Sequence, residues 1–190
     1  MVRARLAPIG EGLQVMVYTK DREALFARIC GYFGRAGFTI AEAKVHTTRA
    51  GYALDTFLVL GQGRTPHTRD MIALIEQELA GELVSDAPLP PPRGGRVSRR
   101  VRHFPISPSV DIRPDERGAY HVLSLVASDR PGLLYAVART LAGYGLNLHT
   151  ARIHTLGDRA EDVLLVSGAA LAEPKRVLQL EQDLLKALQL

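Results

Sequence analysis

The chain contains one sequence pattern twice, and this repeat constrains the fold more than any other feature. Residues 12–61 and 120–168 align with a single one-residue deletion, and the alignment places Asp21 on Asp129. Each copy has the pattern of a strand, a helix, two more strands and a second helix. Because both copies must form the same elements around the same kind of core, the sequence predicts a duplicated module.

The apolar periodicity of the first copy predicts its elements. Every second residue from Leu13 to Val17 is aliphatic, which is typical of a strand with one covered face. Apolar residues at every fourth position from Leu25 to Phe33 indicate a helix, and Asp21 is expected to cap it. The remaining elements are expected in this order: a strand over 38–48 with a bulge near Glu42, a turn at Gly51, a strand over 52–60, and a second helix with Ile72, Ile75 and Leu79 on its inner side.

This order predicts an α+β fold in which two ferredoxin-like βαββαβ modules follow one another in tandem. Each module then still needs a fourth strand. Residues 97–104 are the expected fourth strand of the first module, whereas the second module reaches Leu190 on its second helix. The alternating residues 109–113, followed by a turn at 114–118, are expected to pair antiparallel with the strand that begins near Tyr120, as a permuted edge strand.

The segment between the copies is expected to lie in a long loop. Residues 86–96 contain four prolines and two glycines, and this composition excludes regular structure. We expect a first module over 1–105, which includes this loop before its fourth strand, and a second module over 106–190. In this arrangement only the second module has its fourth strand moved to its start.

Composition argues against a nucleic-acid-binding, membrane or metal protein. The net charge is +4, but five arginines lie within 93–102, which is a connector and not a folded face. No apolar run reaches the ~18 residues of a membrane span, and the first ten residues lack the apolar core of a secretory signal, so a cytoplasmic location is expected. The histidines show no metal-ligand spacing, and Cys30 is expected to be a buried small apolar residue.

The segment Ser128–Leu133, Ser-Asp-Arg-Pro-Gly-Leu, is the most specific local motif. It connects a strand to a helix, and Pro131 is expected within the first helical turn, where its missing N–H costs nothing. Gly132 lets a ligand approach the backbone, and the N–H groups of the first turn suit a small carboxylate. The motif fits a helix cap and tight turn that only packs equally well.

The motif and the residues after it resemble a known family. Asp129–Leu133, followed by Gly145-Leu-Asn-Leu148 at the start of the next strand, resembles the ACT domain, a small amino-acid-sensing regulatory module. The first copy resembles a second ACT domain. With the hairpin 51–57 and the connector 99–105, residues 11–188 are similar to the C-terminal tandem ACT region of the bifunctional uridylyltransferase and uridylyl-removing enzymes. Those bacterial enzymes modify the PII nitrogen-signalling protein.

The resemblance implies ligand-binding residues but no catalytic residues and no metal ligands in this chain. The backbone N–H groups near Gly132 are expected to hold the carboxylate of an amino acid, while its ammonium group donates to Asp129 and Asn147. The first copy is expected to bind more weakly, because Glu23 and Ala24 replace the Pro-Gly pair. The expected residues of the main site are Asp129, Gly132, Leu133 and Asn147, and those of the weaker site are Asp21, Leu25 and Thr39.

The resemblance also implies partners and a mechanism. The ligand would be an amino acid, glutamine by family, and the other partners would be upstream catalytic domains and, through the parent enzyme, the PII protein. No cofactor is expected in this chain, and Mg²⁺ only in the absent catalytic domains. A homodimer through the ACT modules is compatible with the family. Ligand binding would favour one arrangement of the modules and, with it, uridylyl removal over uridylyl transfer.

Two other functions fit parts of the sequence. The length of the chain suits a free-standing tandem ACT regulator, for example a repressor-like partner of a transcription factor. The aromatic residues of segment 49–57 resemble the third-strand motif with which ferredoxin-like RNA-binding modules stack bases. The second copy has no aromatic residue at this place, which argues against RNA binding.

Overall fold

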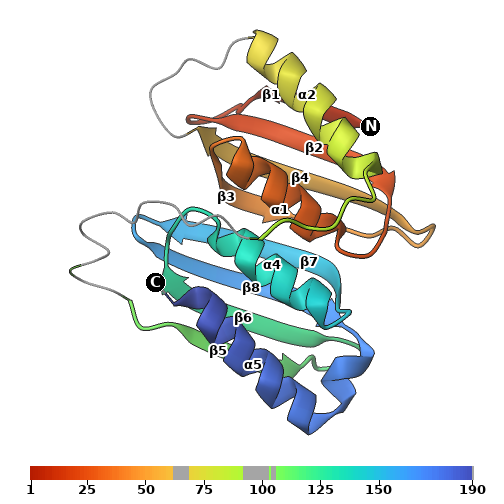
Figure 1. Cartoon of the computed structure of the whole chain (residues 1–190), viewed down its shortest axis with the longest axis vertical. Helices are drawn as coiled ribbons and strands as arrows, with labels where there is room; N and C mark the ends of the chain where they lie inside the picture. Colours follow the sequence, from red (N-terminus) through yellow and green to blue (C-terminus); the bar gives the residue numbers. More distant parts are fainter. Residues whose placement is uncertain (62–68, 92–102, 104–105, 190) are drawn as a thin grey trace.

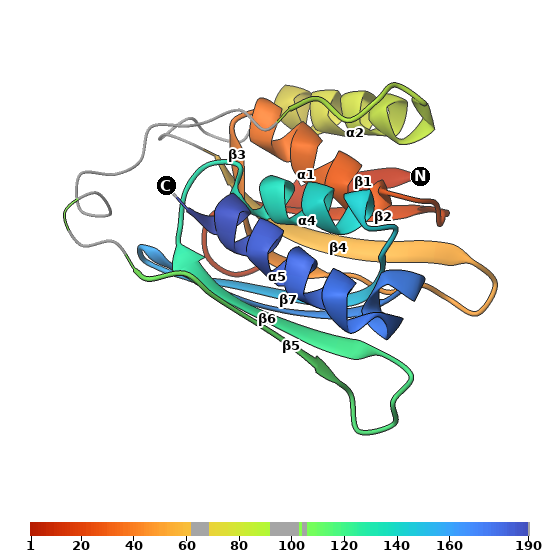
Figure 2. The ribbon, with the colours of Figure 1, turned by 60° about the horizontal axis from the view of Figure 1, so that its bottom comes forward.

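A computed structural model describes residues 1–61, 69–91, 103 and 106–189. The described residues form two modules, each with a four-stranded antiparallel sheet (Figure 1). Both helices of each module cover the same face of its sheet (Figure 2). The first module contains β1 (Val2–Leu6), β2 (Leu13–Lys20), α1 (Leu25–Arg35), β3 (Phe38–Lys44), β4 (Tyr52–Gly61) and α2 (Arg69–Val84). The second contains β5 (Ser109–Pro114), β6 (His121–Ser128), α4 (Leu133–Gly143), β7 (Asn147–Leu156), β8 (Arg159–Ser167), the short 3₁₀ helix η1 (Ala169–Ala172) and α5 (Pro174–Leu188).

The sheet order confirms the predicted tandem ferredoxin-like fold. The strands lie in the order β1-β2-β4-β3 in one sheet and β5-β6-β8-β7 in the other. As predicted, the segment before the second copy forms an edge strand: β5 pairs antiparallel with β6, from Ser109 opposite Val126 to Pro114 opposite His121. The predicted bulge in the first copy is also present, because the register of β3 on β4 shifts between Ile40 and Glu42.

The fourth strand of the first module is not the one expected from the sequence. β1 pairs antiparallel with β2, from Val2 opposite Val17 to Leu6 opposite Leu13. Because β2 then has a strand on each side, the prediction that residues 97–104 fill this edge is wrong; apart from His103, that segment lies outside the described residues. Both modules therefore take their edge strand from the residues before the first strand of the repeat, and the predicted difference between the copies disappears.

The core of each module lies between the sheet and its two helices. Strand alternation places one set of aliphatic and aromatic side chains on the covered face, and these side chains are fully buried, as in Val15 of β2 and Phe57 of β4. The inner faces of the helices complete the core, for example through Phe33 of α1 and Leu184 of α5. Cys30 is buried as expected.

The modules pack against each other through the same elements of each copy. β3 lies beside β7, and α1 lies against α4 (Figure 1), so an approximate two-fold axis relates the modules. Within the described residues no strand pairing joins the two sheets. The helices approach closely at Gly31 of α1, where a Cβ atom would lie 2.8 Å from Cε2 of Tyr135 on α4. This close approach requires the absence of a side chain at Gly31.

Candidate functional site

Two cavities lie at the junction of the modules. Cavity one is lined by residues 21–27 of the first module and by residues 146–148, at the start of β7, in the second. Cavity two is lined by residues 129–135 of the second module and by residues 38–40, at the start of β3, in the first. The loop of one module thus faces the strand of the other in each cavity, and the approximate two-fold axis relates the two cavities.

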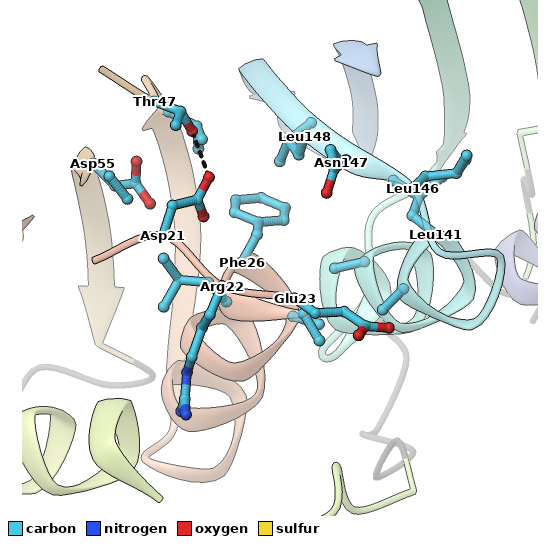
Figure 3. A pocket seen from close by; sticks show the side chains of 17 residues that line it. Asp21, Arg22, Glu23, Phe26, Thr47, Asp55, Leu141, Leu146, Asn147 and Leu148 are labelled. Carbon is cyan, nitrogen blue, oxygen red and sulfur yellow. Dashed lines mark hydrogen bonds between the residues drawn. The ribbon is translucent and has the colours of Figure 1, made fainter. Parts of the chain in front are cut away.

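Polar and acidic groups of both modules line cavity one. Figure 3 shows Asp21 and Asp55 on one side of it and Asn147 on the other, with Phe26 between them. Glu23 also lines the cavity, so the acidic groups of cavity one come from the first module and the amide comes from the second.

The structure divides the residues predicted for a single site between the two cavities. Asp129, Gly132 and Leu133 line cavity two, but Asn147 lines cavity one. The residues predicted for the weaker site are divided in the same way: Asp21 and Leu25 line cavity one, and Thr39 lines cavity two. The cause is the packing of the modules, because the start of each module's β3 or β7 strand faces the loop of its partner module.

The loops of the two copies have the same backbone conformation despite their different sequences. Gly132 is left-handed, with φ 79°, and its counterpart Ala24 is left-handed as well, with φ 58°. A residue with a Cβ atom pays about 1–2 kcal/mol for this conformation. Copy one therefore keeps the shape of the loop without the glycine that favours it.

The helices begin later than expected. α4 starts at Leu133, so the expectation that Pro131 lies inside the first helical turn is wrong. The expectation that Asp21 caps α1 is also wrong: no side chain caps this helix, and Oδ2 of Asp21 accepts a hydrogen bond of 3.0 Å from Oγ1 of Thr47. The Asp21 side chain therefore belongs to the wall of cavity one and not to the end of the helix.

The backbone donors at the start of α4 can be assigned individually. The Leu133 N–H donates to the Arg130 carbonyl at 3.1 Å, and the first intrahelical bond runs from the Ala136 N–H to the Gly132 carbonyl at 2.9 Å. Leu134 and Tyr135 come between these two donors in the sequence, and no backbone acceptor among the described residues is found for their N–H groups. Since the first amides of a helix have no carbonyl partner within it, these two N–H groups are the donors that remain available at this end of α4. In cavity one, the backbone N–H groups that follow Leu25 at the start of α1 occupy the corresponding position.

Each cavity contains one buried carboxyl group that was not among the predicted site residues. Asp55 of β4 lines cavity one and is 1% exposed, and Asp162 of β8 lines cavity two and is 4% exposed. Oδ1 of Asp55 accepts a hydrogen bond of 3.2 Å from the His46 N–H, and Oδ1 of Asp162 accepts one of 3.4 Å from the His154 N–H. The sequence contained one sign of these residues: in both copies an acidic residue stands at a position of the same strand where the alternation places a buried side chain.

Burial controls the ionisation of these carboxyl groups. It raises the pKa of Asp55 and the pKa of Asp162 to about 7, against the opposing effect of the backbone hydrogen bond. The negative charge of Asp21 raises the pKa of Asp55 further, and that of Asp129 does the same for Asp162. The pKa of Asp129 is raised as well, mainly by burial. Near pH 7 each cavity thus contains a buried carboxyl group that is easily ionised by a cation.

The arginine of each loop does not neutralise these acids. Nη2 of Arg22 donates to the Ser85 carbonyl at 2.9 Å, and Nη2 of Arg130 donates to the Ala187 carbonyl at 2.6 Å. Figure 3 shows the Arg22 side chain pointing away from Asp21 and Asp55. Both guanidinium groups lie at the C-terminal end of the second helix of their module, where the helix dipole favours a cation. The cavities are therefore left with an excess of acidic groups.

Other kinds of site find little support in the described part of the chain. It contains no group of three or more His, Cys, Asp or Glu residues that could hold a metal ion, and no helix there is long and apolar enough to cross a membrane. The side chain of Phe57, in the segment that suggested base stacking, is fully buried in the core. Phe57 is therefore not available to stack on RNA, whereas Tyr52, the other aromatic residue of that segment, is exposed and stacks on Tyr18.

Comparison with known proteins places the second module in a described domain family. Residues 121–185 match the model of the ACT domain. The chain is 58% identical over 194 aligned residues to the bifunctional uridylyltransferase/uridylyl-removing enzyme of Cupriavidus pinatubonensis, and 57% and 56% identical to the enzymes of the same name from Cupriavidus metallidurans and Ralstonia nicotianae. These matches cover 99–100% of this chain but only 22% of each relative.

Proposed function

Because the chain contains an ACT domain and corresponds over its whole length to the C-terminal region of bifunctional uridylyltransferase/uridylyl-removing enzymes, we propose that it is a module that senses glutamine. The chain itself is a regulatory region and not the catalytic part of such an enzyme. In the proposal it controls an enzyme of the bacterial cytoplasm that acts on the PII signalling protein.

The observation that carries the proposal is that each cavity has backbone N–H donors close to a carboxyl group. In cavity two, the backbone N–H groups of Leu134 and Tyr135 lie on the same loop and helix as the carboxyl of Asp129. Backbone donors at the positive end of a helix suit the carboxylate of an amino acid, and a carboxylate suits its ammonium group. Gly132 leaves the backbone open for the approach of the ligand. Cavity one offers the same combination through Asp21, with the side-chain oxygen of Asn147 as a further acceptor.

Regulation follows from the position of the cavities between the modules. A ligand that touches the loop of one module and the strand of the other binds best to one relative arrangement of the two modules. It therefore shifts the population towards that arrangement. In the proposed parent enzyme, this arrangement favours uridylyl removal over uridylyl transfer by the attached catalytic domains.

Calorimetric titration of the full chain with a panel of amino acids tests the proposal. We expect heat with L-glutamine and weaker or no heat with glycine, serine, leucine and L-glutamate. Asn147→Ala is expected to weaken binding at cavity one, and Asp129→Ala at cavity two. A lost hydrogen bond to a charged group is worth about 1.5–3 kcal/mol, or about 10- to 150-fold in affinity.

The matched control is Glu116→Ala. Glu116 is an exposed residue of the β5–β6 turn, away from both cavities, and its replacement is expected to leave the affinity unchanged. The proposal is contradicted if no amino acid of the panel produces heat, or if the affinity for glutamine is the same in the wild type and in both cavity variants.

A further inference from the structure

Asp55 and Asp162 are buried carboxyl groups that have no ion-pair partner among the described residues. Both lie on the face of their strand that packs into the core, since Asp55 is two residues from Ala53 on one side and from Phe57 on the other, and all three are buried. Burying a carboxyl group on an apolar face is unfavourable unless its hydrogen-bonding capacity is satisfied. Each of these carboxyls receives a single hydrogen bond from the described residues, from a backbone N–H to Oδ1.

Both carboxyl groups occupy the same place in their cavity. Asp55 lies opposite Val17 on β2, four residues before the loop residue Asp21. Asp162 lies opposite Leu125 on β6, four residues before Asp129. Each cavity therefore combines the acid at the start of the loop with one acid from the neighbouring strand, and cavity one contains Glu23 of the loop as well. The recurrence in both copies, which differ at other cavity residues, indicates a requirement of the site and not an accident of packing.

We infer that Asp55 in cavity one and Asp162 in cavity two hold the ammonium group of the bound amino acid, together with the loop acids Asp21 and Asp129. The inference rests on the proposed function, because it requires that the cavities bind amino acids. It assigns the recognition of the ammonium group to a pair of acids in each cavity. In cavity two, Asp162 takes the role that was expected of the Asn147 side chain, since Asn147 lies in the other cavity.

The charged groups around Asp55 support this assignment. Asp21 at the end of β2 is the acid that faces Asp55. On α1, the pKa of Cys30 is raised by burial and, to a smaller extent, by the negative charge of Asp55. Glu23 and Arg22 of the loop line the same cavity, but the guanidinium group of Arg22 is bonded to Ser85 and Asp86. No cation of the described residues pairs with Asp55. The ammonium group of a bound amino acid would thus be the cationic partner that Asp55 lacks among the described residues.

The surroundings of Asp162 are equivalent. Asp129 at the end of β6 faces it, and Cys30 of α1 is also close to it. Arg130 and Tyr135 line the cavity, but Arg130 is bonded to the Ala187 carbonyl and Tyr135 to the Pro90 carbonyl. Among the described residues no cation pairs with Asp162 either.

Ligand binding then releases protons. In the empty cavity, burial keeps a large part of the strand carboxyl protonated near pH 7. When the ligand's ammonium group enters, the nearby positive charge favours the carboxylate, and the carboxylic acid gives its proton to the solvent while the ligand keeps its own. Affinity therefore increases from pH 6 to pH 8, as the proton that must be displaced becomes easier to remove.

Calorimetric titration of the full chain with L-glutamine in phosphate and in Tris buffer, at pH 7, tests the inference. The two buffers differ in ionisation enthalpy, so the difference in heat counts the protons released. We expect release of about half a proton per cavity at this pH, because a group with its pKa near the ambient pH is about half protonated. We also expect binding at pH 6 to be weaker than at pH 8 by up to about tenfold, the limit set by a carboxyl with its pKa near 7 that is ionised in the complex. Glutaramic acid, which is glutamine without its amino group, should not bind.

Asp55→Asn and Asp162→Asn are the variants, with Glu116→Gln as the control. Asparagine keeps an oxygen that can accept the backbone N–H, so the fold is expected to persist, and each variant should lose the proton release and at least tenfold in affinity at its own cavity. The inference would be overturned if the heat of binding to the wild type did not depend on the buffer and both variants bound glutamine as tightly as the wild type. That result would leave the proposed function standing. No heat with any amino acid would overturn both. The pH series on the wild type tests the inference even if a variant does not fold.

Discussion

Replacing Asp55 by asparagine should change the pH dependence of stability in a predictable direction. The side chain is 1% exposed, and its pKa is raised from the ordinary value of 3.8 to about 7 in the fold, mainly by burial. Below pH 3.8 the folded and unfolded chains both hold the proton, so the carboxyl has no effect on the pH dependence. Between pH 3.8 and pH 7 the unfolded chain ionises while the folded chain keeps the proton, and stability is lost as the pH rises.

The size of the effect follows from these two values. Each pH unit in this window costs about 1.4 kcal/mol, so the full loss above pH 7 is about 4 kcal/mol, of which about 3 kcal/mol is lost between pH 5 and pH 8. The asparagine of the variant cannot ionise and avoids the loss. Its side chain also buries an N–H₂ group, whose unsatisfied donors cost about 1–3 kcal/mol at every pH. The pH-dependent part of the difference between variant and wild type is therefore the informative quantity.

The measurement is urea unfolding of the wild type and of Asp55→Asn at pH 5 and at pH 8, without ligand. The free energy of unfolding of the variant minus that of the wild type should be about 3 kcal/mol larger at pH 8 than at pH 5, so that the variant is relatively more stable at pH 8. Asp162→Asn should behave in the same way, whereas Glu116→Gln should show no such change. A relative stability of Asp55→Asn that is the same at both pH values would refute the reasoning, because it would mean that the carboxyl is already ionised in the fold at pH 5.

Two further predictions concern glycine and backbone conformation. Gly31→Ala should destabilise the chain by about 1–3 kcal/mol in urea unfolding, because its Cβ atom would lie 2.8 Å from the Tyr135 ring. Gly34→Ala on the same helix, which meets nothing within 4 Å, should instead stabilise it by about 0.5–1 kcal/mol; equal effects would show that the helices do not approach as described. Ala24→Gly should stabilise by up to about 1 kcal/mol and Gly132→Ala should destabilise by a similar amount, since both positions have left-handed backbone. Opposite signs in thermal unfolding would contradict this conformation.

The copies are more alike in structure than in sequence. The Pro-Gly pair of the second loop and the Glu-Ala pair of the first form the same turn, with left-handed Gly132 and Ala24. The strand acids Asp55 and Asp162 have the same burial and the same kind of hydrogen bond. The lack of glycine in the first loop is therefore weaker evidence against binding there than the sequence suggested. The pairing of acids predicts that both cavities recognise an ammonium group.

The sequence by itself determined the fold of each module. The repeat and the alternation of aliphatic residues were sufficient because they record which face of each strand and helix is buried. Edge-strand reasoning also predicted residues 109–113 as the edge strand of the second sheet, and the structure has it at Ser109–Pro114. The same reasoning chose residues 97–104 for the first module, whereas the structure has Val2–Leu6 beside β2. A local pattern shows that a segment can form an edge strand, but only the three-dimensional arrangement decides which segment does so.

The candidate site was decided by the tertiary structure. The resemblance to the ACT domain predicted Asp129 and Asn147 as residues of one site, because the family pattern relates positions within one module; the structure places them in different cavities. The modules pack with β3 beside β7 and α1 against α4, so each loop meets the strand of the other module. Which groups share a cavity depends on this packing, and the packing depends on contacts between residues far apart in the chain, such as Gly31 and Tyr135. The repeat encodes the modules, whereas the surface between them creates the two cavities.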